Sequence, residues 1–443
     1  MLKSKLDLID KNSDFGAAGH SGARLSLLEQ VCRKLVLGAL SAMTCGRLKL
    51  TLPEGQTLYI GAQPGSDELI SAEINVLDER FFKRLVVFGH VGLSESYMDG
   101  HWSTPDVAGV IAWALLNVNS CQILEGNGGF RCFNFLGLVN QLLHYGRRNH
   151  ENNSRRNISY HYDLSNDLFK LFLDQSMTYS SAYFKNWNIS LKEAQQEKYE
   201  NLCRKLQLKA SDSVLEIGCG WGGFAEYAAK NFGCRITAVT ISQEQFDYAK
   251  DRLAACGLTD RVVLRLQDYR KIRGQFDKIV SIEMIEAVGH EYLDVFFKQC
   301  NLLLKKDGLL ALQMITCPDS RYDLLRQNTD FIQKHIFPGS QLLSHRRVNQ
   351  ALEHCGSDLF LHDLEDIGNY YAKTLEIWQN EFESRLEAVH KLGFDQVFVR
   401  KWQYYLSYCF SAFAMRNITA VQAVYTRPNN LNLSHSELLK RLV

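Results

Sequence analysis

The chain has 443 residues, of which 46% are hydrophobic, and a formal net charge of +1. This length allows two or three domains, each with its own core. The balanced charge excludes a nucleic-acid binder that works by bulk charge. No apolar run approaches the ~20 residues that cross a bilayer, and the N-terminus lacks the apolar core of a signal peptide, so we expect a cytoplasmic protein. The 12 cysteines form no CxxC pair. This favours reduced thiols over disulfides or a metal site.

The first 150 residues predict a small α+β domain. Arg24 to Thr44 has helical periodicity, Leu48 to Ile60 is typical of a hairpin, and Asp106 is placed to cap a helix that runs to Val118. The polar segment from His144 to Asn157 contains four arginines. It indicates either a solvated linker or a contact for lipid phosphates.

We expect a second domain over residues 151–443, in which the chain alternates strand and helix patterns from about Val214, and this predicts a doubly wound α/β sheet. Parallel strands place their ligand-facing turns at the carboxyl edge of such a sheet. A mostly helical insertion over about 318–415 is long enough to cover a substrate site. The expected strands are Val214–Ile217, Arg235–Thr240, Val262–Leu266, Lys278–Ile282, Leu309–Met314 and Ile418–Tyr425.

The segment from Val214 to Ala228, VLEIGCGWGGFAEYA, is the most informative one. Its apolar strand breaks into a turn in which Gly218, Gly220 and Gly223 satisfy G-x-G-x-x-G, and a helix follows. Bare glycine backbone lets a ligand approach closely. The turn alone fits a dinucleotide, an adenosyl ligand or a purely structural role.

Polar residues follow the other strands. The second expected strand ends in Thr240 and Ser242 with Gln245 beyond, where a dinucleotide fold would carry an acid, and this weakens the NAD interpretation. Gln267 and Asp268 follow the third strand and could face an adenine edge. Glu283 and Glu286 follow the fourth. They share one face if a helical turn starts there, and the alternative is that both are solvated.

Several motifs, taken together and in order, make the chain resemble the cyclopropane-fatty-acyl-phospholipid synthase family. The resemblance covers about residues 85–427 and includes an N-terminal GLSESYMDGHW that is similar to the long bacterial form. It implies a Rossmann-like class I methyltransferase domain that uses S-adenosylmethionine, preceded by a small α+β N-terminal domain. The motifs are HYDLSNDLF, MTYSSAYF, VLEIGCGWGGFA, VTISQEQ, QDYR, IVSIEMIEAVG, HIFPGSQLLS and NYYAKTLEIW.

The resemblance also implies roles for single residues in binding S-adenosylmethionine. Tyr179 and Ser180 would close over its methionine end, and the glycine turn would lie beneath it. The remaining implied cofactor contacts are Gly218, Gly220, Trp221 and Gly222 in the turn, Thr240, Ser242 and Gln245 at the ribose, and Gln267 and Asp268 near adenine.

Methyl transfer to an alkene produces a carbocation, which aromatic faces stabilise without trapping it. The aromatic candidates are Tyr371, Tyr370, Phe331 and Tyr292. A base must then remove a proton from the new methyl group before the ring can close. The resemblance implies that a bound bicarbonate is this base. Its implied contacts here are Glu286, Tyr371, the backbone of Ile315, and the positions of Ser181 and Gln313.

Two of these positions depart from the family pattern, since Ser181 replaces a cysteine and Gln313 a histidine. A neutral glutamine donates a hydrogen bond but supplies no positive charge. The alternatives to a cyclopropane are therefore a methyl or methylene branch, methylation of a small amine, and a lipid-binding protein that has lost activity. Cys409 matches a cysteine that has been called catalytic in the family, but its aromatic neighbours favour a structural role.

The resemblance implies an unsaturated phospholipid as substrate. With no spanning helix, access to it must be peripheral, and we expect residues 1–150 to dock at the inner face of the membrane. Arg147, Arg148, Arg155 and Arg156 could meet anionic headgroups there. By analogy we also expect a homodimer. We expect neither a nucleic acid nor a metal as a partner.

Overall fold

The structure is a computed structural model that describes residues 25–62, 70–118, 165–434 and 440. These residues fall into two compact units. Unit 1 lies within Met1–Val139 together with Gln396–Tyr404, and unit 2 within Asn140–Asp395 together with Tyr405–Val443. The boundary expected near residue 150 falls outside the described residues, as does the segment from His144 to Asn157.

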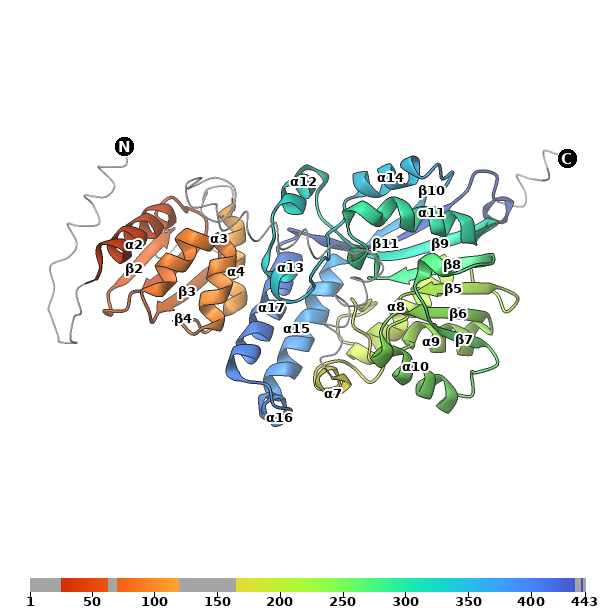
Figure 1. The fold of residues 1–443 in the computed structure, drawn as a ribbon, viewed down its shortest axis with the longest axis horizontal. Coiled ribbons are helices and arrows are strands. Elements are labelled where there is room, and N and C mark those ends of the chain that lie inside the picture. The colour runs from red at the N-terminus through yellow and green to blue at the C-terminus, as the bar shows by residue number, and fades with distance from the viewer. Residues whose placement is uncertain (1–24, 63–69, 119–164, 435–439, 441–443) are drawn as a thin grey trace. The chain divides into compact units, whose positions relative to one another are not determined.

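Unit 1 is a four-stranded sheet in the order β2-β1-β3-β4 with helices packed on it (Figure 1). The predicted hairpin is confirmed, since β1 pairs antiparallel with β2. The parallel pairing of β3 with β1 was not predicted. The strands are β1 (Arg47–Thr51), β2 (Thr57–Gly61), β3 (Ser71–Val76) and β4 (Trp102–Ser103), and the helices are α2 (Leu27–Leu40), α3 (Arg80–Met98) and α4 (Val107–Leu116).

Helix α2 is shorter than expected at both ends. It begins after Ser26, whose hydroxyl accepts from the Glu29 backbone while the Glu29 carboxylate accepts from the Ser26 backbone. This capping box satisfies two backbone donors at the helix start. Helix α4 does begin after Asp106, but the Asp106 side chain makes no capping hydrogen bond. The predicted position of the cap is therefore right, and the predicted contact is wrong.

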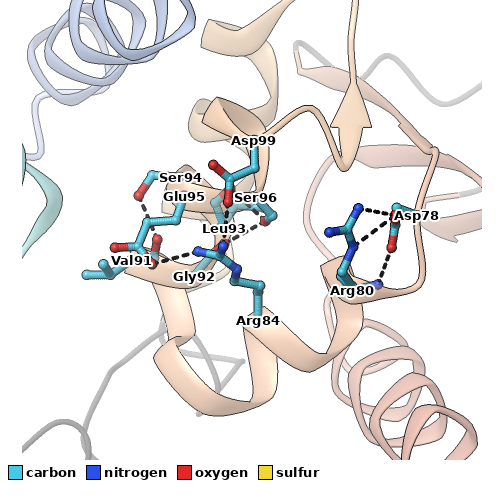
Figure 2. Close-up of polar contacts among 10 residues, drawn as sticks. All are labelled: Asp78, Arg80, Arg84, Val91, Gly92, Leu93, Ser94, Glu95, Ser96 and Asp99. Carbon is cyan, nitrogen blue, oxygen red and sulfur yellow. Dashed lines mark hydrogen bonds and ion pairs between the residues drawn. The ribbon is translucent and has the colours of Figure 1, made fainter. Parts of the chain in front are cut away.

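Helix α3 is two helices joined by a sharp kink. Gly89 has φ 56° and ψ −132°, which lies outside the helical region and suits glycine. Beyond the kink the chain turns back, and Arg84 forms ion pairs with Glu95, at 3.0 Å, and with Asp99 (Figure 2). These contacts hold the segment GLSESYMDGHW against the first half of the helix.

Gly92 lies where the two halves of α3 meet. A Cβ atom at this position would lie 2.1 Å from the carbonyl oxygen of Arg84. We expect Gly92→Ala to destabilise the protein by about 2 kcal/mol or more, because the backbone must shift. Gly38→Ala in α2 is the control, since its Cβ would meet nothing within 4 Å, and it should gain up to about 1 kcal/mol. Thermal unfolding measures both, and equal effects would contradict the prediction.

Unit 2 is built on a seven-stranded sheet in the order β10-β11-β9-β8-β5-β6-β7. The pairs from β9 through β8, β5 and β6 to β7 are parallel, and β11 is antiparallel to both β9 and β10. The predicted doubly wound sheet is confirmed. The strands are β5 (Ser213–Ile217), β6 (Arg235–Thr240), β7 (Val262–Leu266), β8 (Phe276–Ile282), β9 (Leu304–Thr316), β10 (Phe360–Asp366) and β11 (Thr419–Thr426).

Helices cover both faces of this sheet (Figure 1). Helices α11 and α14 lie on one face, and α8, α9 and α10 lie on the other. Each of these two groups of helices covers one buried apolar cluster. The helices from α7 onward are α7 (Asn166–Phe169), α8 (Leu191–Lys205), α9 (Gly223–Phe232), α10 (Gln243–Ala255), α11 (Leu293–Leu303), α12 (Asp319–Gln327), α13 (Phe331–His335), α14 (His345–His354), α15 (Gly368–Ser384), α16 (Leu386–Lys391) and α17 (Gln396–Ala414).

The expected helical insertion contains helices α12 to α17, but it also contains strand β10, which was not predicted. β10 has the sequence FLHDLED and lies at the edge of the sheet, with Phe360, Leu361 and Leu364 all exposed. An edge strand with charged residues and no β-branched residue lacks the composition by which strands are recognised.

Candidate active site

The glycine turn lies between β5 and α9, at the carboxyl edge of the sheet. The backbone N–H groups of Gly218 and Cys219 both donate to the Val239 carbonyl at 3.0 Å, which ties the turn to β6. Gly218 has φ +83°, and a Cβ there would lie 2.5 Å from Met284. Gly220 has φ +51°, and a Cβ there would meet nothing within 4 Å. The turn thus presents bare backbone to open space.

The next residues start helix α9 and close the base of the turn. Gly222, in a left-handed conformation, is the N-cap residue and has no side chain to cap the helix. A Cβ on Gly223 would lie 2.5 Å from the Tyr199 hydroxyl, so this glycine permits close helix packing. The buried Trp221 donates from Nε1 to Asn166 at 2.7 Å. The predicted turn residues therefore share one rigid corner of the sheet.

The residues expected at the ribose are buried and bond to one another. The Thr240 hydroxyl donates to Gln245 Oε1 at 2.9 Å and accepts from the Ser242 backbone N–H at 3.2 Å. The Ser242 hydroxyl accepts from the Gln245 backbone N–H and so caps α10. The structure brings the three together at the end of β6, beside the glycine turn.

The two residues expected near adenine bond within their own turn. Gln267 donates to the Lys271 carbonyl at 3.1 Å, and Asp268 pairs with Arg270 at 2.6 Å. Burial would raise the pKa of Asp268, but the hydrogen bonds and charge of Arg270 hold that pKa below its usual range. Asp268 therefore stays ionised and fixes this turn next to the end of β7.

A buried lysine lies behind the residues expected at the methionine end. Lys198 is 0% exposed, and its ammonium donates to the Ser180 hydroxyl at 2.7 Å. Burial lowers the pKa of Lys198 to about 7, against the opposing charge of Glu283. The Tyr179 hydroxyl lies 2.7 Å from that of Tyr405. The sequence analysis missed Lys198, although the spacing of Ala194, Lys198 and Leu202 places it on the buried face of α8.

Three of the residues expected around a bicarbonate converge on the carboxylate of Glu283. Glu283 Oε1 accepts the Ser181 backbone N–H at 2.9 Å and Gln313 Nε2 at 2.7 Å. Its Oε2 accepts the Tyr371 hydroxyl at 2.7 Å. Burial raises the pKa of Glu283, while these donors and the charge of Lys198 oppose the rise. Glu283 lies deep in the fold but is not sealed, since its accessible surface is intermediate.

Gln313 is held as a donor by further amides. Its Oε1 accepts from Gln422 Nε2 at 2.9 Å, and Gln422 Oε1 accepts from Asn201 at 2.9 Å. Gln313 and Gln422 face each other in the β9–β11 register. Because Oε1 of Gln313 is occupied as an acceptor, its NH₂ group points to Glu283. This amide relay fixes the orientation of the Gln313 side chain.

Glu286 lies one turn further along and bonds differently from Glu283. Its Oε1 accepts the Ile315 backbone N–H at 2.5 Å, whereas its Oε2 is buried without a hydrogen-bond partner among the described residues. Burial and the charge of Glu283 raise the pKa of Glu286 to about 8. The charge of Glu283 acts on Glu286, but the helical turn begins only at Ile285 and Glu283 has φ +49°, so the expectation that one helical turn carries both acids is wrong. Glu283 accepts three hydrogen bonds and Glu286 accepts one, which favours the negative charge on Glu283.

Of the aromatic candidates, only Tyr371 contacts this carboxylate. Tyr371 stacks on Phe413, with centroids 4.3 Å apart, and meets Trp378 edge-on at 6.4 Å. The other three lie in different surroundings. Tyr370 packs on Tyr183 and Trp187, Phe331 packs on His335 and Tyr408, and Tyr292 packs against the apolar core. Trp378, which the sequence analysis did not select, also lies 5.2 Å from Tyr179.

Cys409 is a free, partly buried thiol on α17. Burial raises the pKa of this thiol, so it stays protonated at neutral pH. Only the thiolate is a good nucleophile, and the structural interpretation of Cys409 therefore agrees with its surroundings.

The two expected ligands fit this site differently. The open backbone at Gly220, next to the polar ends of β6 and β7, fits an adenosyl ligand such as S-adenosylmethionine. Bicarbonate does not fit, because the Ser181, Gln313 and Tyr371 donors already hold the carboxylate of Glu283.

Comparison with known proteins identifies the family. Residues 149–423 match the family described as mycolic acid cyclopropane synthetase. The chain belongs to this family. It is 37% identical over 341 residues to tuberculostearic acid methyltransferase UfaA1 of Mycobacterium tuberculosis, covering 75% of this chain and 77% of that protein. It is 36% identical over 369 residues to cyclopropane-fatty-acyl-phospholipid synthase of Escherichia coli K12, covering 80% and 88% respectively.

Among solved structures, unit 2 is similar to that of mycolic acid cyclopropane synthase CmaA1 complexed with SAH and CTAB. The TM-score is 0.58 at 28% identity, over 63% of this chain and 99% of that one. This cyclopropane synthase family member is therefore an S-adenosylmethionine-dependent methyltransferase with the class I fold that its sequence predicted.

The pKa of Glu286 predicts how stability depends on pH. The folded-state value of about 8 lies above the ordinary 4.5, so the contribution of Glu286 to stability is full below about pH 4.5 and is lost as the pH rises to about 8. Relative to wild type, Glu286→Gln should gain on the order of a few kcal/mol between about pH 5 and pH 9. Denaturant unfolding at the two pH values measures this gain. The exposed Glu383→Gln is the control, and a pH-independent difference for Glu286→Gln would contradict the prediction.

Proposed function

We propose that this methyltransferase adds the methyl group of S-adenosylmethionine to the double bond of an unsaturated acyl chain in a phospholipid and closes a cyclopropane ring. One observation supports this most directly. The carboxylate of Glu283, at the end of β8 in the sheet that carries the glycine turn, accepts the Tyr371 hydroxyl at 2.7 Å, and the Tyr371 ring packs against Phe413 and Trp378. A carbocation needs aromatic faces, and ring closure needs a base.

Each part of the site has a task in this reaction. S-adenosylmethionine supplies an electrophilic methyl group when it is bound. Tyr179 and Ser180, the latter fixed by Lys198, would close over its methionine end, and the turn at Gly218 and Gly220 would lie beneath it. Holding the methyl group in line with the π bond at near-attack distance is the main demand, since an alkene is a poor nucleophile.

The aromatic side chains stabilise the cation that forms on the acyl chain. Tyr371 is held by Phe413 and by its hydrogen bond to Glu283, so its ring cannot turn away. The quadrupole of an aromatic face attracts a cation without bonding to it. The Tyr371 hydroxyl is occupied as a donor, and burial raises the pKa of Tyr371, so no phenolate is available to trap the cation.

Formation of a methyl or methylene branch is the second candidate. The relative named tuberculostearic acid methyltransferase is as similar to this chain as the relative named cyclopropane-fatty-acyl-phospholipid synthase. The same cation gives a branch when the proton leaves the chain, or when a hydride shift precedes proton loss from the methyl group. The fate of that proton decides between ring and branch.

Mass spectrometry of the product distinguishes these outcomes. The purified protein is incubated with unsaturated phospholipid vesicles and methyl-deuterated S-adenosylmethionine, and the fatty acids are then released. We expect an added carbon that carries two deuteriums, in a chain that resists mild hydrogenation. Two deuteriums in a chain that does hydrogenate would mean a methylene branch, and three a methyl branch. Absence of label would contradict an acyl substrate.

The substrate also requires contact with a bilayer. None of the helices in the described ranges is long and apolar enough to span one, so we propose peripheral attachment at the inner membrane face through residues 1–150. Helix α2 in unit 1 exposes Leu27, Leu28 and Val31, at 79%, 53% and 47% respectively. Such side chains can enter the headgroup region, and basic residues strengthen contact with anionic lipids.

The four arginines at 147, 148, 155 and 156 test the electrostatic part of this attachment. Replacing all four with glutamine should weaken binding to anionic vesicles at least about tenfold at low salt, because each basic residue near the surface contributes about 1 kcal/mol. Co-sedimentation measures the binding, with neutral phosphatidylcholine vesicles as the control. Unchanged binding to anionic vesicles would exclude a role for these arginines.

A further inference from the structure

Glu283 has a backbone conformation that its residue type disfavours. Its φ is +49°, in the left-handed region where glycine is at ease and a side chain meets steric resistance. The backbone is fixed in this state by the donation of the Glu283 N–H to the Gln313 carbonyl at 2.8 Å. A strained residue at an active site indicates that its side chain is used there.

The carboxylate of Glu283 takes all the donors that an external anion would need. The Ser181 N–H, the Gln313 amide and the Tyr371 hydroxyl come from three separate segments and meet on its two oxygens. A second anion at the same place would lose these donors and would be repelled by the ionised carboxylate. Glu286 carries no positive charge that would offset this repulsion.

We propose that Glu283 is the proton acceptor of this enzyme and replaces a bound bicarbonate. The inference rests on the proposed function and adds a catalytic residue to it. The methyl–sulfur bond breaks with its electron pair left on sulfur, and the π pair of the alkene forms the new carbon–carbon bond. A C–H bond of the added methyl group then breaks. Its electron pair closes the ring, and its proton goes to the Glu283 carboxylate, which becomes a neutral carboxylic acid.

Oε2 is the oxygen that takes the proton. Oε1 accepts two hydrogen bonds, whereas Oε2 accepts one, from Tyr371, so Oε2 keeps a free lone pair among the described contacts. The same Tyr371 presents its ring to the cation, which places the base beside the reacting carbons. Three donors also hold the carboxylate in place and make it a weaker nucleophile, which disfavours ester formation with the cation.

Gln313 suits such a built-in base better than a histidine would. A cationic imidazolium next to Glu283 would lower the pKa of the carboxyl and weaken it as a base. A neutral amide orients the carboxylate without that effect. A glutamine in place of histidine at position 313 and a carboxylate at position 283 therefore both favour a base supplied by the protein itself.

Two variants test the proposal in buffer freed of carbon dioxide. Wild type should turn over at an unchanged rate without bicarbonate. Glu283→Gln should lose at least about 100-fold in kcat, while its affinity for S-adenosylmethionine stays within about twofold. Glu283→Gly removes the carboxylate and relieves the left-handed backbone, and this relief offsets part of the cost of leaving the three donors without an acceptor; circular dichroism checks that the variant is folded. Its turnover should be lost without bicarbonate and recover at least about tenfold when bicarbonate is added.

A second measurement does not depend on turnover. ¹³C NMR of labelled bicarbonate in the presence of S-adenosylhomocysteine should show binding to Glu283→Gly and none to wild type. Gln207→Gly is the matched control, since Gln207 is exposed and has φ +52°. The Gln207→Gly substitution relieves a left-handed backbone conformation that lies away from the site, so it should change neither turnover nor anion binding.

The outcomes separate the two hypotheses. A wild-type enzyme that needs or binds bicarbonate, a Glu283→Gln variant with wild-type kcat, or a Glu283→Gly variant that neither binds bicarbonate nor recovers with it would overturn the role of Glu283. If wild type transfers no methyl group to any unsaturated phospholipid, the proposed function fails. Binding of bicarbonate to Glu283→Gly alone would then still support the assignment of Glu283 to the anion position.

Discussion

The site depends on the hydrogen bonds that hold the carboxylate of Glu283, which lies deep in the fold. An ionised carboxyl group deep in a protein is stable only when donors surround it. Here the donors come from the loop at Ser181, from Gln313 on β9 and from Tyr371 on α15. The hydrogen bonds to the Glu283 carboxylate therefore connect three parts of the fold: the segment before α8, the centre of the sheet and the helical insertion.

The glycine turn and Glu283 lie at the same edge of the sheet. The glycine turn after β5 is tied to β6 through Val239, and its neighbour β8 ends directly in Glu283. The contact of Met284 with Gly218 connects the two, because any side chain at residue 218 would displace it. The position of the carboxylate relative to the turn is thus set by packing that tolerates little change.

The sequence analysis predicted the central features of unit 2 because each had a local signal. Apolar runs marked β5, β6 and β8, and the glycine turn marked the ligand corner. The structure also brings Tyr371, Ser181 and Gln313 together, through hydrogen bonds to Glu283. Glu283 was noticed as one of two acids, but the implied role went to Glu286, which matched the motif. Glu283 differs from Glu286 in accepting three hydrogen bonds, from residues up to 102 positions away in the sequence. No local sequence pattern encodes such contacts.

Other misses have the same physical origin. Lys198 sits in a very polar helix and is recognisable as buried only from its i, i+4 neighbours. β10 depends on pairing with β11, because its own sequence has no strand signature. Trp378 belongs to a motif that was recognised, yet its contact with Tyr371 follows from the geometry of one helix in three dimensions.

The amide relay from Asn201 through Gln422 to Gln313 has one further consequence. Amides transmit orientation through their hydrogen bonds, but they do not exchange protons readily as imidazoles and carboxyls do. The relay therefore fixes the direction of a donor while insulating Glu283 from Glu365, the acid that Asn201 also contacts. A proton gained by Glu283 would therefore not pass to Glu365 along this relay. The ionised state of Glu283 would have to be restored by another route, and Lys198 and Glu286 are the titratable neighbours nearest to it by charge.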